Sequence, residues 1–211
     1  MEQSKLDKKI NWKKLHDYVK ISLKDDKTGH DYEHTRRVLL IAADIAKSCA
    51  NVDYDVLTAA CLMHDIAYKD GPVKDHHIKG AEESESIIRI LGFDNLKVKK
   101  IKEAIEDHVG HVQKPLRKNE ELQIESRILR DADNIDALGA IGLIRQISFC
   151  VARGIPYFIS KEDKFNESVY GGIREIMTWA DNMLTVGGRK IAKERLKIMK
   201  DFLEQMEKEY S

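Results

Sequence analysis

Helical spacing of hydrophobic residues through almost the whole sequence is the feature that most constrains the fold. Apolar side chains return every three or four residues, as they do in helices that bury one face. No segment shows strict apolar–polar alternation, and no Asn-Gly or Asp-Gly turn joins two such segments. The pattern therefore predicts an all-α fold. The expected helices span Asp7–Leu23, Tyr32–Cys49, Tyr54–His64, Asp75–Leu91, Asn95–Val109, Glu120–Leu138, Ala140–Ala152, Asn166–Met183 and Gly188–Tyr210.

Length and charge narrow the class of protein. A chain of 211 residues fits one domain, since domains commonly hold roughly 100–200 residues. The 36 basic residues balance the 36 acidic ones, and 42% of the residues are hydrophobic, which excludes a disordered chain. The absence of net charge also argues against a nucleic acid or an anionic membrane as partner.

Targeting signals and disulfides are not expected. The longest apolar stretches, Val38–Ala43 and Ala137–Ile144, fall far short of the roughly 18 residues that cross a bilayer. The charged first residues contain no apolar segment of a secretory signal. Three scattered cysteines without a Cys-x-x-Cys pair indicate reduced core residues. We expect a cytoplasmic protein.

Several ionisable residues fall on the apolar faces of their own helices, where side chains point into the core or its edge. They are His34, His64, His77, His108 and Asp133, and Asp65 directly follows His64. A single histidine in such a place is usually a hydrogen-bonded core residue. A buried carboxylate needs a partner, and Asp133 could find it in Arg130 three residues earlier or in a cation shared with the histidines. The periodicity leaves both explanations open.

Three segments then resemble one known family. Gly29–Val38 (GHDYEHTRRV), Cys61–Ile66 (CLMHDI) and Arg130–Gly142 (RDADNIDALGAIG) are similar to the H…HD…D motifs of the HD-domain metal-dependent phosphohydrolases. The last segment resembles a bacterial subgroup of predicted HD hydrolases that includes nucleoside triphosphate pyrophosphohydrolases. The resemblance extends from about residue 27 to residue 145, with a weaker similarity in Thr185–Arg195.

This resemblance implies an all-α HD-domain helical bundle with a central metal site. Carried over position by position, the metal ligands are His34, His64, Asp65 and Asp133. Two imidazoles and two carboxylates suit a divalent ion such as Mn, Fe, Co, Ni or Mg. We expect a single HD domain over residues 1–211, with a core at about 27–145 and covering C-terminal helices at 160–211.

Further residues near these motifs have more than one possible role. His77 and His108 resemble positions that bind a second ion in some HD proteins, and the alternative is that they act as general acid or phosphate contacts. Asp31 either orients His34 or caps its helix, and Asp136 could support the site one turn after Asp133. Candidates for substrate contact are Lys69, Asp70 and Arg145, although Lys69 and Asp70 also fit an exposed turn. His76 and His111 are expected to be solvated.

The leading functional hypothesis is a metal-dependent phosphohydrolase that cleaves a phosphoester or phosphoanhydride, in a nucleotide, by metal-activated water. Two alternatives stay open: a di-iron HD-type oxygenase that uses the extra histidines, and a non-catalytic nucleotide-binding HD module. The expected partner is a small phosphorylated molecule rather than nucleic acid or membrane. The amphipathic C-terminal helix leaves a homodimer open.

Overall fold

The computed structural model describes residues 10–26, 29–71, 73–109, 117–158 and 167–210. No strand occurs among these residues, so the predicted all-α fold is confirmed. The α-helices are α1 (Trp12–Ser22), α2 (Tyr32–Ala46), α3 (Tyr54–Met63), α4 (His76–Ile90), α5 (Asn95–Glu106), α6 (Ile124–Asp136), α7 (Gly139–Val151), α8 (Val169–Thr178) and α9 (Val186–Tyr210). Short 3₁₀ helices are η1 (Ile66–Asp70), η2 (Asn119–Glu121) and η4 (Trp179–Asn182).

Most predicted helices are present with shorter ends. The segment predicted at 120–138 divides into η2 and α6, and the segment predicted at 166–183 divides into α8 and η4. Several helices begin at an acidic or polar cap that accepts backbone N–H groups, such as Asp53 before α3 and Asp94 before α5. The first predicted residues, 7–9, lie outside the described part of the chain.

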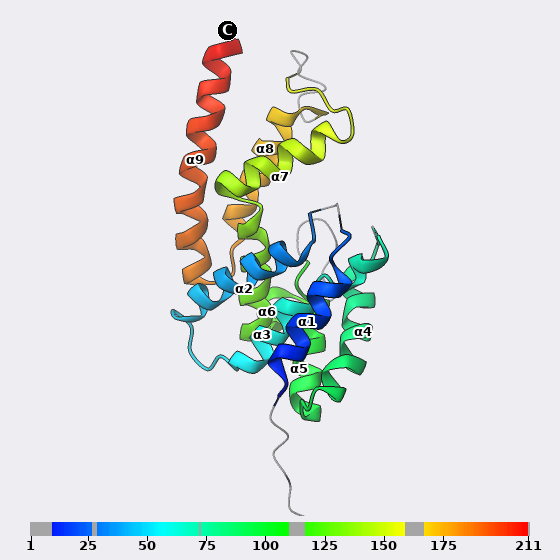
Figure 1. Ribbon diagram of the computed structural model, residues 1–211. Coiled ribbons are helices and arrows are strands. Elements are labelled where there is room, and N and C mark those ends of the chain that lie inside the picture. Colours follow the sequence, from blue (N-terminus) through cyan, green and yellow to red (C-terminus); the bar gives the residue numbers. More distant parts are fainter. Residues whose placement is uncertain (1–9, 27–28, 72, 110–116, 159–166, 211) are drawn as a thin grey trace, which may run out of the picture.

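Helix α3 lies at the centre of the bundle. It packs against α1, α2, α4, α5 and α6, and Figure 1 shows it enclosed by these helices. Seven of its ten side chains are buried, including the run Ala59–Met63, and the exposed Tyr54 lies at its far end. A helix that is apolar on all sides has to be buried. The end of α3, where His64 and Asp65 follow, therefore lies inside the protein.

The C-terminal helices lie along one side of this bundle. Helix α9 (red in Figure 1) contacts α2 and α6 as well as α7 and α8. The division into a core at 27–145 and covering helices at 160–211 stays a prediction, and residues 27, 28 and 160–166 lie outside the described part.

Membrane spans and cysteines bear on the class of protein. Within the described residues, no single helix is long and apolar enough to span a membrane. The pair α6 and α7 passes this test of length and composition only when the two are counted together, and they are bent by 67° at the break between them. All three cysteines are free, with Cys61 and Cys150 buried and Cys49 half-buried.

Candidate metal centre

Three helices bring four of the predicted side chains together. His34 lies in the first turn of α2, His64 and Asp65 follow α3, and Asp133 lies in the last turn of α6. Nε2 of His34 is 3.3 Å from Nε2 of His64, 3.3 Å from Oδ2 of Asp65 and 3.4 Å from Oδ1 of Asp133. The convergence expected from helical periodicity is therefore present, whereas the role of these residues as metal ligands stays a prediction.

The adjacent pair His64–Asp65 can face one point because α3 ends there. Successive side chains of a continuing helix diverge by about 100°. His64 still has helical angles, but Asp65 has φ −106° and ψ 15°, which leave the α-helix. Nε2 of His64 and Oδ2 of Asp65 consequently lie 3.2 Å apart.

Hydrogen bonds on the far side of each imidazole direct its Nε2 lone pair into the cluster. Nδ1 of His64 donates to the carbonyl oxygen of Cys61 at 2.8 Å, and Nδ1 of His34 donates to Oδ2 of Asp136 at 2.8 Å. With both Nδ1 protons engaged, the two Nε2 atoms face each other and two carboxylates. Such an arrangement needs a proton or a cation between the donors.

The donor set fits a divalent ion. At metal–ligand distances of about 2.1 Å, neighbouring ligands of an octahedral ion lie about 3.0 Å apart. The separations of 3.2 to 3.4 Å around His34 and Asp65 are slightly larger. Asp133 lies 3.4 Å from His34 but 3.9 Å from His64, and it stands outside the close group of His34, His64 and Asp65. Mixed imidazole and carboxylate ligands suit Mn, Fe, Co or Ni.

Charge coupling in the metal-free cluster is strong. Burial would raise the pKa of the Asp65 and Asp133 carboxyls, but the adjacent histidines hold both pKa values below their usual range. Burial would likewise lower the pKa of His34, and its hydrogen bonds to Asp133, Asp136 and Asp65 instead raise it to about 10. Protonated His34 thus offsets part of the negative charge of the Asp65 and Asp133 carboxylates at neutral pH.

A second group of donors shares Asp65. Its other oxygen, Oδ1, lies 3.7 Å from Nε2 of His76 and 3.8 Å from Nε2 of His108, and these two nitrogens are 3.1 Å apart. Nδ1 of His108 donates to the carbonyl oxygen of Ile105, which again leaves the Nε2 lone pair inside. Burial lowers the pKa of His108 to about 3, so its imidazole is neutral.

The expectation for His76 and His77 is corrected here. The His76 side chain is only 12% exposed and lies in the cluster, so the prediction that it is solvated is wrong. His77 is buried on the expected face, but its ring centroid is 6.5 Å from that of His108 and it belongs to neither donor group. His111 lies outside the described residues.

Three of the further candidate residues lie away from the donors. Asp31 caps α2, because its side chain accepts the backbone N–H of His34 at 2.8 Å. Lys69 forms an ion pair with Glu83 at 2.8 Å, and the Asp70 side chain is 78% exposed. Of the alternatives left open from the sequence, capping for Asp31 and an exposed turn for Asp70 are the ones found.

Asp136 and Arg145 are joined to the cluster. The buried Asp136 carboxylate contacts His34, and Arg145 donates to Oδ2 of Asp136 at 2.5 Å. Arg130, considered above as a partner of Asp133, instead donates to the carbonyl oxygen of Asp107. The Asp133 carboxylate therefore faces the histidines without an arginine partner of its own.

Two rings missed by the sequence reasoning border the cluster. His30 stacks on Tyr68 with ring centroids 4.0 Å apart, and Tyr68 tilts against His76. The Asp133 side chain is 28% exposed, against 0 to 3% for the other three donors, so the cluster opens to solvent beside Asp133. No spacing pattern marks Tyr68, because it lies in η1 rather than on a periodic helix face.

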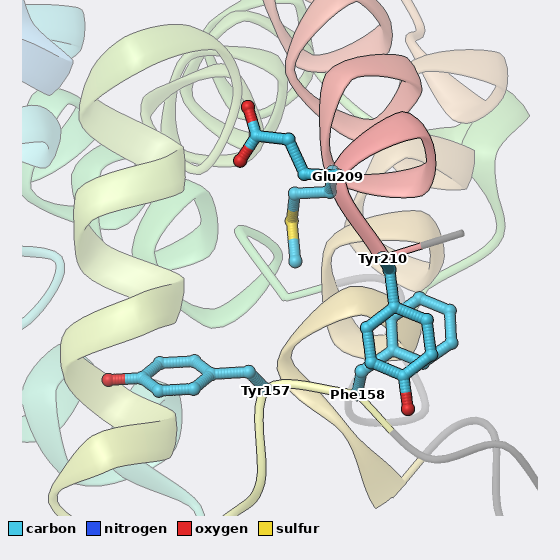
Figure 2. A pocket seen from close by; sticks show the side chains of 5 residues that line it. Tyr157, Phe158, Glu209 and Tyr210 are labelled. Carbon is cyan, nitrogen blue, oxygen red and sulfur yellow. The ribbon is translucent and has the colours of Figure 1, made fainter.

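A surface groove of about 460 Å³ lies elsewhere, at the C-terminal end of α9. Tyr157, Phe158, Met206, Glu209 and Tyr210 line it, and Figure 2 shows Phe158 and Tyr210 side by side, with ring centroids 4.0 Å apart. None of the four clustered donors borders this groove.

Comparison with known families decides the assignment. A family model described as HD domain matches residues 31–138, about half of the chain. The chain belongs to the HD domain family. The matched HD segment begins at the cap of α2 and ends just beyond α6, so it contains all four converging donors. The family expected from the three motifs is confirmed.

Related proteins match this HD domain over nearly its whole length. The YpgQ protein of Bacillus subtilis (strain 168) is 27% identical over 192 residues, which cover 91% of this chain and 90% of YpgQ. The crystal structure of YpgQ in complex with ADP has a TM-score of 0.74 at 26% identity and covers 93% of each chain. An HD-superfamily hydrolase from Bacillus thuringiensis has a TM-score of 0.73 at 25% identity, with 94% of this chain and 95% of that chain covered.

Proposed function

We propose that this HD domain is a metal-dependent hydrolase that cleaves a phosphoester or phosphoanhydride bond of a nucleotide. The observation that carries the proposal is the inward direction of the Nε2 lone pairs of His34 and His64 toward the carboxylates of Asp65 and Asp133. These four residues would hold the ion. When bound, a divalent ion would lower the pKa of a water molecule and polarise a phosphoryl oxygen.

Nucleotide specificity is supported by the relatives. A structure of YpgQ contains ADP, and similar chains are HD-superfamily hydrolases. The stacked rings of His30 and Tyr68 provide a flat boundary to the cluster, because His30 packs against His34 and Tyr68 against His76. Burial and the Asp65 and Asp133 carboxylates raise the pKa of the Tyr68 hydroxyl, which keeps it protonated and able to donate a hydrogen bond.

The test uses the metal-free protein reloaded with Mn²⁺ and a panel of nucleoside mono-, di- and triphosphates. Release of phosphate or pyrophosphate is expected, and Asp133→Asn should abolish it. His16→Gln is a matched control, because His16 lies on α1 and its Nδ1 contacts Tyr32 outside the cluster. Failure of the Mn²⁺-loaded protein to release either product from any nucleotide would refute hydrolysis. Tight nucleotide binding without product would favour the non-catalytic module.

We further propose that Asp65, His76 and His108 would hold a second ion, with Asp65 between the two. The support is that its two oxygens face different pairs of histidines. His76→Gln should lower the measured number of bound ions from two to one per chain, whereas His77→Gln should not. One ion in the wild-type protein would refute the second site.

A centre with two ions also suits oxygen chemistry, so the di-iron oxygenase is kept as a second candidate. Metal analysis of protein purified without added metal separates the two functions. Two irons per chain with oxygen uptake would favour the oxygenase, and a redox-inert ion with phosphate release would favour the hydrolase. The cytoplasmic location and the homodimer stay proposals, and light scattering of the purified chain tests the dimer.

A further inference from the structure

Asp136 is a fully buried carboxylate with three side-chain partners. It lies on α6, three residues after Asp133, and has no exposed surface. Oδ2 accepts the Nδ1–H of His34 at 2.8 Å. Arg37 binds both oxygens, at 2.8 and 3.0 Å, and Arg145 donates to Oδ2 at 2.5 Å. A buried carboxylate is stable only with such compensation.

The two arginines fix the orientation of this carboxylate. Arg37 comes from α2 and binds Asp136 with two parallel hydrogen bonds, a geometry that prevents rotation of the carboxylate. Arg145 comes from α7 and also donates to the carbonyl oxygen of Gly29, so its guanidinium is anchored on both sides. Oδ2 is consequently held against the imidazole of His34.

Two different groups compete for Nδ1 of His34. Oδ2 of Asp136 lies 2.8 Å away and can only accept, whereas the Arg145 nitrogen lies 3.2 Å away and can only donate. Donation to Asp136 leaves the lone pair on Nε2, which faces Asp65 and Asp133. Acceptance from Arg145 would instead place the proton on Nε2 and block it as a ligand. Asp136 therefore decides which nitrogen of His34 is available.

His34 differs in this respect from the other inward histidines. Nδ1 of His64 and Nδ1 of His108 donate to backbone carbonyl oxygens, of Cys61 and Ile105. Those acceptors belong to the helix ends and persist in any side-chain variant. His34 is thus the one of these three imidazoles whose available nitrogen depends on a replaceable side chain.

We propose that Asp136, oriented by Arg37 and Arg145, is a positioning residue that keeps the Nε2 lone pair of His34 directed at a bound divalent ion. The inference rests on the proposed metal site but not on the identity of the substrate. Carboxylates that hold a ligating histidine in this way typically account for 10- to 100-fold in metal affinity.

The test is Asp136→Asn with Mn²⁺ affinity as the readout, measured on metal-free protein by calorimetry or by competition with a chelator. Oδ2 accepts from His34, Arg37 and Arg145 together, and an amide oxygen in its place lacks the negative charge, so it holds the Nδ1–H of His34 more weakly than the carboxylate does. We expect the Mn²⁺ dissociation constant to rise about 10- to 100-fold. In ¹⁵N spectra of Zn²⁺-loaded protein, the Nδ1–H signal of His34 should shift from its wild-type position, because its hydrogen bond to a neutral amide is weaker.

The matched control is Asp131→Asn. Asp131 is also a buried aspartate of α6, but it accepts hydrogen bonds from Leu184 and Thr185 and contacts none of the clustered donors. This variant should lose thermal stability while its Mn²⁺ affinity stays within about twofold of the wild type at 20 °C. A purely structural role of Asp136 predicts that both variants behave alike.

Should Asp136→Asn not fold, Arg37→Gln replaces it. This change keeps the acceptor for His34 but removes its bidentate support, and a smaller rise of the dissociation constant is expected. Wild-type Mn²⁺ affinity in Asp136→Asn, or in Arg37→Gln where it takes its place, together with lost affinity in Asp133→Asn, would overturn the positioning role and leave the proposed function intact. A wild-type protein that binds no divalent ion would overturn both.

Discussion

Replacement of Asp131 by alanine should destabilise the fold at the contact between α6 and α9. The buried carboxylate accepts the backbone N–H of Leu184 at 2.8 Å, the backbone N–H of Thr185 at 2.8 Å and the Thr185 hydroxyl at 2.6 Å. The Thr185 hydroxyl in turn accepts the N–H of Gly188 in the first turn of α9. One side chain of the helix that carries Asp133 thus organises the start of α9.

The expected loss follows from which donors stay buried. Leu184 is partly exposed, so water can replace the carboxylate at its N–H, but the Thr185 N–H is buried. An unsatisfied buried donor costs about 1–3 kcal/mol, and the lost hydroxyl hydrogen bond adds about 1 kcal/mol. We therefore expect Asp131→Ala to lose about 2–4 kcal/mol. In a chain of this size each kcal/mol lowers the melting temperature by about 2–4 °C, which gives roughly 5–15 °C.

Circular dichroism melts in the presence of a chelator measure this loss without a contribution from bound metal. Asp131→Asn should lose about 1 kcal/mol less, since its amide oxygen can still accept from Thr185. Thr185→Val should cost less in the Asp131→Ala background than alone, because the two residues share one hydrogen bond, but in both backgrounds it removes the acceptor of the Gly188 N–H. A melting temperature of Asp131→Ala within 1 °C of the wild type would refute the reasoning.

Three further predictions concern the metal site. Mn²⁺ at 100 times its dissociation constant should stabilise the fold by about 2.7 kcal/mol, seen as a higher melting temperature that EDTA reverses and Asp133→Asn lacks. The pKa of His34 is raised to about 10, so protonated His34 stabilises the metal-free fold fully below pH about 6.5 and less as pH rises toward 10. Thermal melts with EDTA should show a melting temperature that declines over this pH range. A melting temperature that rises over the same range would contradict the argument. Gly80→Ala places a Cβ 3.2 Å from the His64 carbonyl oxygen, next to the metal ligands. The main expected effect is a smaller number of bound ions per chain, measured by metal analysis, and the expected change in melting temperature, measured by thermal melts, is minor.

Much of the fold and the first donor group follows from the sequence because both depend on local periodicity. His34 and Asp133 lie on faces set by neighbours three and four residues away, and the helices that carry them are where the spacing predicts. The end of α3 at Met63 is also local in origin, since the apolar run ends there.

Contacts between distant segments could not be derived in this way. Arg37 and Asp136 are 99 residues apart, and Arg145 and Gly29 are 116 residues apart. Their pairing depends on how α2, α6 and α7 pack, which no spacing within one helix specifies. Local spacing can also suggest a contact that does not form. Arg130 lies three residues before Asp133 on the same helix, yet its guanidinium binds the carbonyl oxygen of Asp107.

The sequence predicts that His77 joins the second donor group, but His76 lies there instead. The periodicity correctly places His77 on the buried face, but an amphipathic helix also has an edge, and His76 lies on it in the first turn. Gly80, four residues later on the same side, allows the backbone of α4 to approach the carbonyl oxygen of His64. A glycine at such a close approach marks the side of a helix that touches its neighbour most tightly. His76 therefore meets Asp65 at the end of α3, while His77, buried on the same helix, belongs to neither donor group.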